Sequence, residues 1–183
     1  MSRFTTALAA TLIHEGLYSN DPNDRGGETI CGISRRSFPE WYGWKIVDGI
    51  LPKPVKSILP KLQEAINDFY EINFWNKIKC DQITDDCIAI ELFDCCVNIG
   101  QPRAVRVLQS ALNLLNLNGK RYRDIQEDGS IGTITISLVN DHPDKGFLLK
   151  MMKTLRACHY VNLAIHDTTQ EVYIKGWLNR VIS

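Results

Sequence analysis

Residues 86–98 constrain the fold most, because this segment reads as a helix that is apolar on most of its sides. Thr84, Asp85 and Asp86 supply an N-cap and an acidic first turn, and the helix breaks at 100–102. A helix without a broad polar face has to be covered by other elements. We therefore expect this segment at the centre of a core made of packed helices.

Periodic apolar residues predict further helices around this one, over 2–16, 58–76, 103–115, 132–140, 145–166 and 170–181. Residues 17–34 differ, because they are rich in turn-forming residues and leave room only for short hairpin strands near 28–33. The pattern predicts a mostly α protein, a helical bundle with a small loop or β-hairpin element near the N-terminus.

The composition excludes several classes of protein. The chain has 183 residues, of which 44% are hydrophobic and 23% charged, and 21 Lys and Arg balance 21 Asp and Glu. This balance argues against a dedicated nucleic-acid binder, which would carry a basic domain, and against a disordered chain. No apolar run reaches the roughly 18 residues that a membrane-spanning helix needs.

Glu15 is the first candidate for chemistry. Phe4, Leu8, Leu12 and Glu15 share one face of the predicted first helix, and Glu15 stands at its C-terminal end. Partial desolvation there favours a protonated carboxyl, which is the form that a general acid needs. A carboxyl at the edge of an apolar face is also commonly a capping or solvated residue, so position alone leaves both readings open.

Asp24 and Thr29 follow in the glycine-rich loop, on either side of Gly26 and Gly27. The glycines allow backbone conformations that side chains would forbid. If the loop folds back over the helix end, it brings Asp24 and Thr29 opposite Glu15. Two carboxylates and a hydroxyl around a cleft suit the cleavage of a glycosidic bond.

No motif for a metal or cofactor stands out. A calcium loop of the EF-hand type that began at Asp21 would need Glu at its twelfth position, where Gly32 stands. Phosphate-cradling and dinucleotide motifs are absent, and the four histidines have no metal-ligand spacing. We expect no cofactor and no metal.

The loop carries a resemblance to a known family. HEGLYSNDPNDRGGETICGIS is similar to the signature of the muramidase family of phage endolysins and secretion activator proteins, roughly E-G-G-Y-x-N-D-P-x-D-x-G-G-x-T-x-x-G-I-[ST]. The sequence departs from it at Leu17, where the family usually has Gly, and at Ser34, where Thr is common. Shorter matches to the family's downstream motifs follow at Phe93-Asp94, Val97–Gly100, Asp128–Gly132 with Thr135, and Lys175–Arg180.

The resemblance implies a lysozyme-like α+β fold and cleavage of the β-1,4 bond between N-acetylmuramic acid and N-acetylglucosamine in peptidoglycan. Glu15 would be the general acid, Asp24 would position water or steady charge, and Thr29 would help to hold the water. Residues 1–100 would form the lysozyme-like catalytic region. Residues 101–183 would form a helical, predicted peptidoglycan-binding region packed into the same globule.

We expect the glycan strands of peptidoglycan to contact Tyr18, Asn20, Gly26, Gly27, Gly32 and Asn98. Asn98 either binds an N-acetyl group or caps the end of its helix, and both readings stay open. Trp41, Tyr42 and Trp44 either stack on sugar rings or pack a loop over the core.

Two alternatives to a hydrolase remain: a lytic transglycosylase, or a non-catalytic protein that binds peptidoglycan or assists secretion. Asp24 and Thr29 beside Glu15 favour hydrolysis over the first, and chitin is an alternative substrate. The N-terminus lacks a convincing signal peptide. We therefore expect the protein to wait in the cytoplasm and to reach the cell wall or periplasm through a holin or another membrane partner, with no nucleic acid among its partners.

Overall fold

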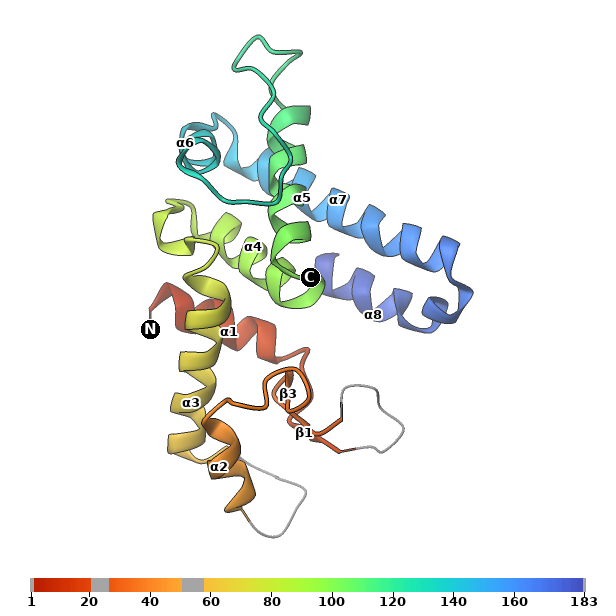
Figure 1. Ribbon diagram of the computed structural model, residues 1–183. Coiled ribbons are helices and arrows are strands. Elements are labelled where there is room, and N and C mark those ends of the chain that lie inside the picture. Colours follow the sequence, from red (N-terminus) through yellow and green to blue (C-terminus); the bar gives the residue numbers. More distant parts are fainter. Residues whose placement is uncertain (1, 21–26, 51–57, 183) are drawn as a thin grey trace. The chain divides into compact units, whose positions relative to one another are not determined.

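The computed structural model describes residues 2–20, 27–50 and 58–182. The chain divides into two compact units, Met1–Lys77 and Ile78–Ser183, and each is described by itself (Figure 1). Within the described ranges no helix is both long enough and apolar enough to cross a membrane.

The first unit combines helices with a small sheet. Its helices are α1 (Arg3–Leu12), α2 (Gly43–Asp48) and α3 (Pro60–Tyr70), and α3 continues into a π-helical turn at Glu71–Trp75. Its antiparallel sheet has the order β1-β2-β3, with strands Tyr18–Ser19, Thr29–Ile30 and Ile33–Ser34.

Local sequence explains where α1 and α3 begin and which faces they bury. Ser2 caps α1, because its hydroxyl accepts a hydrogen bond from the Thr5 N–H at 3.2 Å, and Pro60 starts α3 at a position where its missing N–H costs nothing. The face that α1 buries contains Phe4, Ala7, Leu8 and Thr11. The face that α3 buries contains Leu62, Ala65, Ile66, Phe69 and Tyr70.

The first helix is shorter than predicted. We expected a helix over 2–16, but α1 ends at Leu12. The N–H groups of His14 and Glu15 bond to the carbonyls of Thr11 and Leu12, three residues back. These tight bonds end the helix, so Glu15 lies in the turn that follows it.

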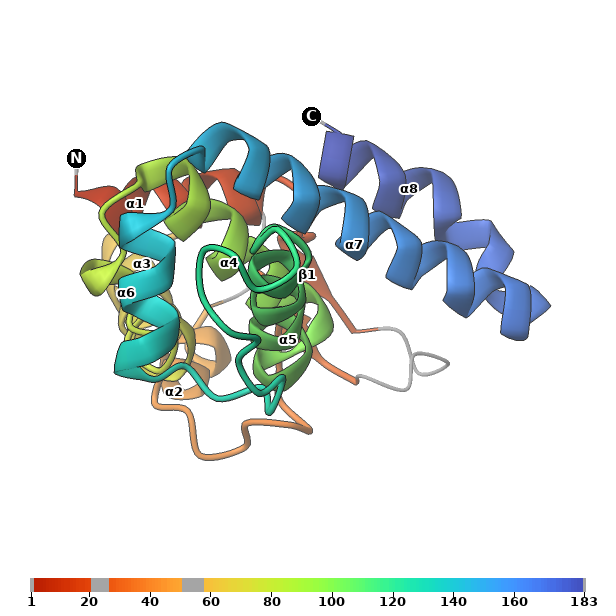
Figure 2. The ribbon, with the colours of Figure 1, turned by 90° about the horizontal axis from the view of Figure 1, so that it is seen from above.

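The second unit is helical throughout its regular elements. They are α4 (Asp86–Ile99), α5 (Gln101–Leu114), α6 (Thr133–Asp141), α7 (Lys145–His166) and α8 (Glu171–Ile182), with short 3₁₀ turns at Cys80–Gln82 and Thr168–Gln170. The helices α7 and α8 run side by side as a hairpin (Figures 1 and 2).

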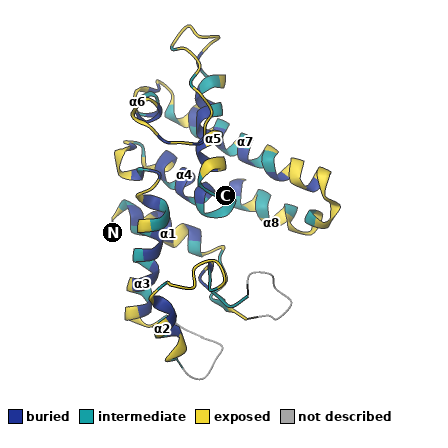
Figure 3. Cartoon of the chain, in the orientation of Figure 1, coloured by how far each residue is buried: buried dark blue, intermediate teal, exposed yellow. Residues whose placement is uncertain are grey.

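The helix α4 occupies the centre of this unit, as the sequence predicted. Asp85 caps it by accepting from the Ile88 N–H at 2.9 Å, and α4 packs against both α5 and α7. Its side chains include Ile88, Ala89, Leu92, Phe93, Cys95 and Cys96, all with no exposed surface (Figure 3). The predicted fold class, mostly α with a small β element near the N-terminus, is confirmed.

The segment 128–132 forms a turn that α5 holds. The buried Gln109 donates to Asp128 Oδ1 at 2.9 Å and to the Ser130 carbonyl at 3.1 Å, and its oxygen accepts from the Gly129 N–H at 2.9 Å. A Cβ at Gly129 would lie 2.7 Å from the Pro102 carbonyl oxygen. Glycine is therefore required for this turn to approach the start of α5.

A buried ion cluster joins α4, α7 and α8. Arg156, which has no exposed surface, contacts Glu91 at 2.9 Å and Asp94 at 2.7 Å, and Arg180 contacts Asp94 at 2.7 Å. Burial opposes the charge of Asp94, but hydrogen bonds and charges of Arg180 and Arg156 hold its pKa below the usual value. The cluster balances two carboxylates with two guanidinium groups.

We expect Arg156→Ala to lower the free energy of unfolding by about 3–5 kcal/mol, because removing one partner leaves Glu91 and Asp94 short of positive charge in the interior. Arg123→Ala is the control, since Arg123 is exposed and its loss should change stability by less than about 0.5 kcal/mol. Urea denaturation of both variants measures the difference. Equal stabilities would contradict a structural role for the cluster.

A second prediction concerns pH. Burial lowers the pKa of His142 below the ordinary 6.5, and the side chain is 4% exposed. Below about pH 6.5, His142 takes up a proton more readily in the unfolded chain than in the folded chain. The free energy of unfolding therefore decreases as the pH falls below this value. We expect urea denaturation between pH 7 and 5 to show a smaller loss for His142→Gln than for the control His166→Gln, where the histidine is exposed. Identical pH profiles would contradict this.

Candidate active site

The carboxylate of Glu15 rests against the turn between β2 and β3. Glu15 itself is half-buried in the turn after α1, and its N–H donates to the Leu12 carbonyl at 3.2 Å. A Cβ built on Gly32 would lie 3.0 Å from Glu15 Oε2. The side chain is therefore fixed beside protein backbone rather than extended into bulk solvent.

Tyr70 reaches the same turn from α3. It is 1% exposed, and its hydroxyl donates to the Cys31 carbonyl at 2.6 Å. A Cβ on Gly32 would lie 2.7 Å from this hydroxyl oxygen. Gly32 also has a φ of +79°, so both its backbone conformation and its crowded surroundings call for glycine.

Sequence reasoning missed Tyr70, which it treated only as part of an apolar helical stripe. A signal was present, because a tyrosine on a buried helix face needs a hydrogen-bond partner for its hydroxyl. The sequence alone could not identify that partner, since it lies 39 positions away along the chain.

Cys31 is the other titratable side chain at this turn. Burial, and then the nearby Glu15 carboxylate, raise the pKa of the Cys31 thiol to about 11. The thiol therefore stays protonated at neutral pH and is a poor nucleophile. The candidate chemistry at this turn belongs to the carboxylate, not to the sulfur.

The strand register places Thr29 in the sheet, opposite Ser19 on β1 and Ser34 on β3. The half-buried Thr29 donates its hydroxyl hydrogen to the Gly27 carbonyl at 3.1 Å. Its oxygen lone pairs remain able to accept a hydrogen bond. This arrangement is compatible with the predicted role of holding a water molecule.

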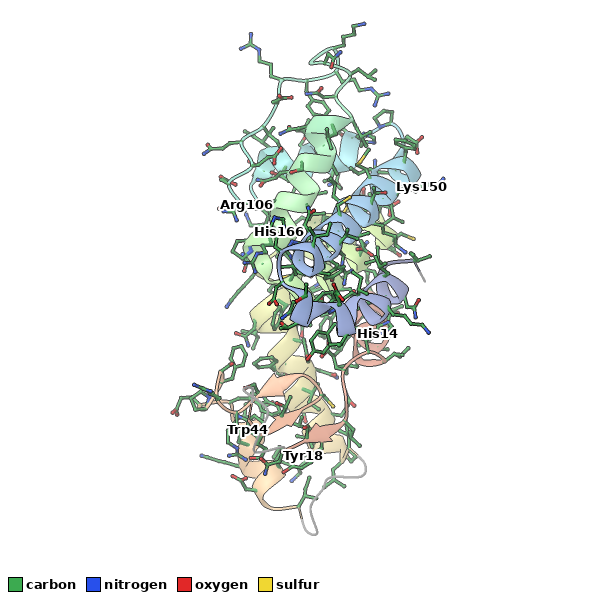
Figure 4. The ribbon with its side chains drawn as sticks, turned by 90° about the vertical axis from the view of Figure 1, so that its right-hand side faces the viewer. His14, Tyr18, Trp44, Arg106, Lys150 and His166 are labelled. Atoms are coloured by element: carbon green, nitrogen blue, oxygen red, sulfur yellow. The ribbon has the colours of Figure 1, made fainter. Side chains whose placement is uncertain are left out.

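Tyr18 belongs to a chain of polar contacts at the sheet. Its hydroxyl donates to Glu28 Oε1 at 2.8 Å, and Arg35 donates to Glu28 Oε2 at 2.6 Å and to Asp48 Oδ1 at 2.5 Å. The Arg35 guanidinium lies 4.3 Å from the ring centre of Trp44; Tyr18 and Trp44 are labelled in Figure 4. Sequence reasoning missed Glu28, for which the loop pattern gave no signal.

Of the three aromatic residues at 41, 42 and 44, the two tryptophans pack against the core of the first unit. Trp44 is 3% exposed and donates to the Phe38 carbonyl at 2.8 Å, and Trp41 donates to the Ala65 carbonyl at 3.2 Å. Tyr42 is exposed, and its hydroxyl contacts Asp68 at 2.7 Å. Packing over the core therefore accounts for Trp41 and Trp44.

The structure describes only some of the remaining predicted site residues. Asp24 and Gly26 lie outside the described residues. Asn20 is exposed just after β1, and Gly27 has a φ of +65° with open space around it. Asn98 belongs to the second unit, where its side-chain oxygen accepts a hydrogen bond from Tyr160 and is thereby held against α7.

Across the residues that the structure describes, no group of three or more His, Cys, Asp or Glu side chains could hold a metal ion. The described part of the site offers a carboxyl, a tyrosine hydroxyl and a threonine hydroxyl instead. The carboxyl can move a proton and the threonine hydroxyl can orient a polar group, whereas the buried tyrosine hydroxyl is engaged with the Cys31 carbonyl.

Gly32→Ala and Gly27→Ala form a matched pair. Both place alanine at a positive φ, which costs about 1–2 kcal/mol, but only the Gly32 substitution also meets Glu15 and Tyr70. We expect Gly32→Ala to lower the free energy of unfolding more than Gly27→Ala does, because its added methyl group must displace the Glu15 and Tyr70 side chains. Urea denaturation of both variants measures the difference. Equal behaviour of the two variants would contradict the contact.

Comparison with known proteins adds to this geometry. No curated protein matches the sequence. The solved structure of Brucella abortus SagA is similar, with a TM-score of 0.66 and 24% identity over 97% of this chain and 88% of that chain. At this identity the likeness shows the fold alone.

Two protein families match successive parts of the sequence. Residues 103–182 match the family described as "Predicted Peptidoglycan domain", and residues 8–100 match the family described as "Glycosyl hydrolase 108". Together they support a glycosidase that acts on peptidoglycan, and the predicted family resemblance is confirmed. Because the second match spans just over half of the sequence and includes Glu15, Thr29 and Gly32, the chain belongs to the glycosyl hydrolase 108 family.

Proposed function

We propose that the protein is an N-acetylmuramidase that hydrolyses the β-1,4 bond between N-acetylmuramic acid and N-acetylglucosamine. The observation that carries this proposal is the placement of the Glu15 carboxylate against the crowded turn at Gly32, beside Tyr70. This turn lies within the part of the chain that matches the glycosidase family. A half-buried carboxyl fixed in this way suits proton donation to a bridging sugar oxygen.

In the proposed reaction, Glu15 gives its proton to the glycosidic oxygen as the bond from that oxygen to the anomeric carbon breaks. The leaving sugar departs with a new hydroxyl, and positive charge develops at the anomeric carbon. Water adds its oxygen to that carbon and releases a proton to solvent, and Glu15 takes up a proton again before the next cycle. Thr29, whose lone pairs can accept a hydrogen bond, helps to hold this water, and Asp24 positions it or steadies the charge.

Tyr70 acts on this reaction as a positioning residue. Its hydroxyl is already bonded to the Cys31 carbonyl, so it holds the backbone on which Glu15 rests. The glycine between these two side chains lets both approach from opposite elements, one from the end of α1 and the other from α3.

Glu15→Gln tests the acid directly. Glutamine keeps the shape but cannot donate the proton, and general acid catalysis contributes about 10²–10⁴-fold. We expect clearing of a peptidoglycan suspension to slow at least about 100-fold, while circular dichroism stays unchanged. Glu40→Gln is the control, because Glu40 is an exposed carboxylate, and it should clear as fast as the unaltered protein. Wild-type activity of Glu15→Gln would exclude Glu15 as the acid.

The products distinguish this proposal from its alternatives. Mass spectrometry of the digest should find reducing N-acetylmuramic acid ends. Anhydro-muramic ends would indicate a lytic transglycosylase instead, and equal digestion of chitin would show that the lactyl-bearing sugar is not required. Absence of any cleavage by the unaltered protein would favour a non-catalytic binding role.

A further inference from the structure

A groove runs between α5 and α7 in the second unit. It encloses a cavity of about 420 Å³, lined by side chains from both helices and from Ile99 at the end of α4. The two helices pack directly against each other (Figures 1 and 2). The residues that line this groove all belong to the second unit, whereas the described side chains of the candidate active site belong to the first.

The two walls of the groove follow from helical spacing. Arg103, Arg106 and Ser110 stand at i, i+3 and i+7 on α5, and His159 and Asn162 stand at i and i+3 on α7. Residues so spaced share one face of a helix. Each helix therefore contributes polar side chains to the same groove; Arg106 is labelled in Figure 4.

The charged side chains that line the groove are both arginines. Arg103 and Arg106 are exposed, and the nearest carboxylate that contacts a lining side chain is that of Glu127, which accepts a hydrogen bond from Ser110 at 2.5 Å. Arg106 donates to the carbonyls of Glu127 at 3.3 Å and Asp128 at 3.5 Å, so its guanidinium is held by the backbone of the neighbouring turn. Arg103 has no ion pair within the described part of the chain.

The charge of Arg103 on α5 affects His159 on α7, across the groove. Burial, and then the positive charge of Arg103, lower the pKa of His159. His159 is therefore mostly neutral at pH 7 and offers a hydrogen bond rather than a second charge on that wall. The groove thus combines guanidinium groups on one side with neutral polar groups on the other.

This chemistry suits a small ligand with carboxylates and peptide groups. Guanidinium groups bind carboxylates through paired hydrogen bonds, and the Asn162 amide matches peptide carbonyl and N–H groups. The Ser110 hydroxyl donates to Glu127 Oε2, so it can only accept a hydrogen bond from a peptide N–H. Val107 and Leu155 add an apolar lining that fits small side chains such as that of alanine. Two exposed arginines in a chain of zero net charge are too few for a nucleic-acid surface.

We propose that the groove between α5 and α7 binds the carboxylate-bearing stem peptide of peptidoglycan. The peptide, rather than the glycan, brings the carboxylates and the small apolar side chains that the groove can accommodate. The groove lies within residues 103–182, apart from Ile99, the part that matches the "Predicted Peptidoglycan domain" family. The inference rests on the proposed function for the identity of the polymer.

Calorimetric titration of the full chain tests this proposal. The probe is a synthetic sugar-free stem tetrapeptide with free carboxylates, compared with the same peptide in which every carboxylate is amidated. We expect the free-acid peptide to bind at least about fivefold more tightly than the amidated one. Arg103→Gln should weaken binding of the free-acid peptide at least about fivefold. Arg123→Gln removes an equally exposed arginine outside the groove and should bind as the unaltered protein does.

Three results would overturn the proposal: no binding of the free-acid peptide, equal affinity of Arg103→Gln and the unaltered protein, or equal affinity for the amidated peptide. Inorganic phosphate that competes with the same affinity as the peptide would show a general anion site and would also overturn it. Cleavage of peptide-free glycan strands is measured in parallel. If the unaltered protein does not cleave these strands but still binds the peptide in a way that depends on Arg103, only the muramidase proposal is contradicted.

Discussion

The hydrogen bond from the Tyr70 hydroxyl to the Cys31 carbonyl is the contact on which the candidate active site depends. It ties α3 to the turn between β2 and β3, and this turn is the surface on which Glu15 rests. The turn, α3 and the segment after α1 meet at Gly32, where a Cβ atom would come too close to the Tyr70 hydroxyl and the Glu15 carboxylate. The buried face of α3 thereby helps to position a carboxyl that the short turn after α1 could not position alone.

In the second unit, buried charges link three of the helices. Arg156 and Arg180 from α7 and α8 meet Glu91 and Asp94 from α4. Such a cluster gives little net stability compared with apolar packing, but each group depends on its partners once it is buried. Tyr160 extends the same contacts, because its hydroxyl lies 3.0 Å from the Arg156 Nε and donates to Asn98. Asn98 is therefore held by the cluster that holds the helices together.

Sequence periodicity predicted the long helices well, because burial of one face or of all faces leaves a regular pattern. The largely buried α4 and its Asp85 cap are examples. The end of α1 was predicted too late, since the tight bonds at His14 and Glu15 depend on the path of the following chain. Glu15, Thr29 and Gly32 could be singled out from their motif. Tyr70 could not, because its hydrogen-bond partner Cys31 is distant along the chain. Glu28 could not, because its contact with Tyr18 depends on the side-chain conformations of both residues.

The raised pKa of Cys31 has a consequence for redox chemistry. Disulfide exchange requires a thiolate, and a thiol with a pKa of about 11 supplies very little of it at neutral pH. Cys31 is also 4% exposed, so oxidants have little access to its sulfur. Burial and the neighbouring Glu15 carboxylate thus protect the Cys31 thiol from oxidation. The turn can therefore keep its shape in an oxidising medium without a disulfide bond.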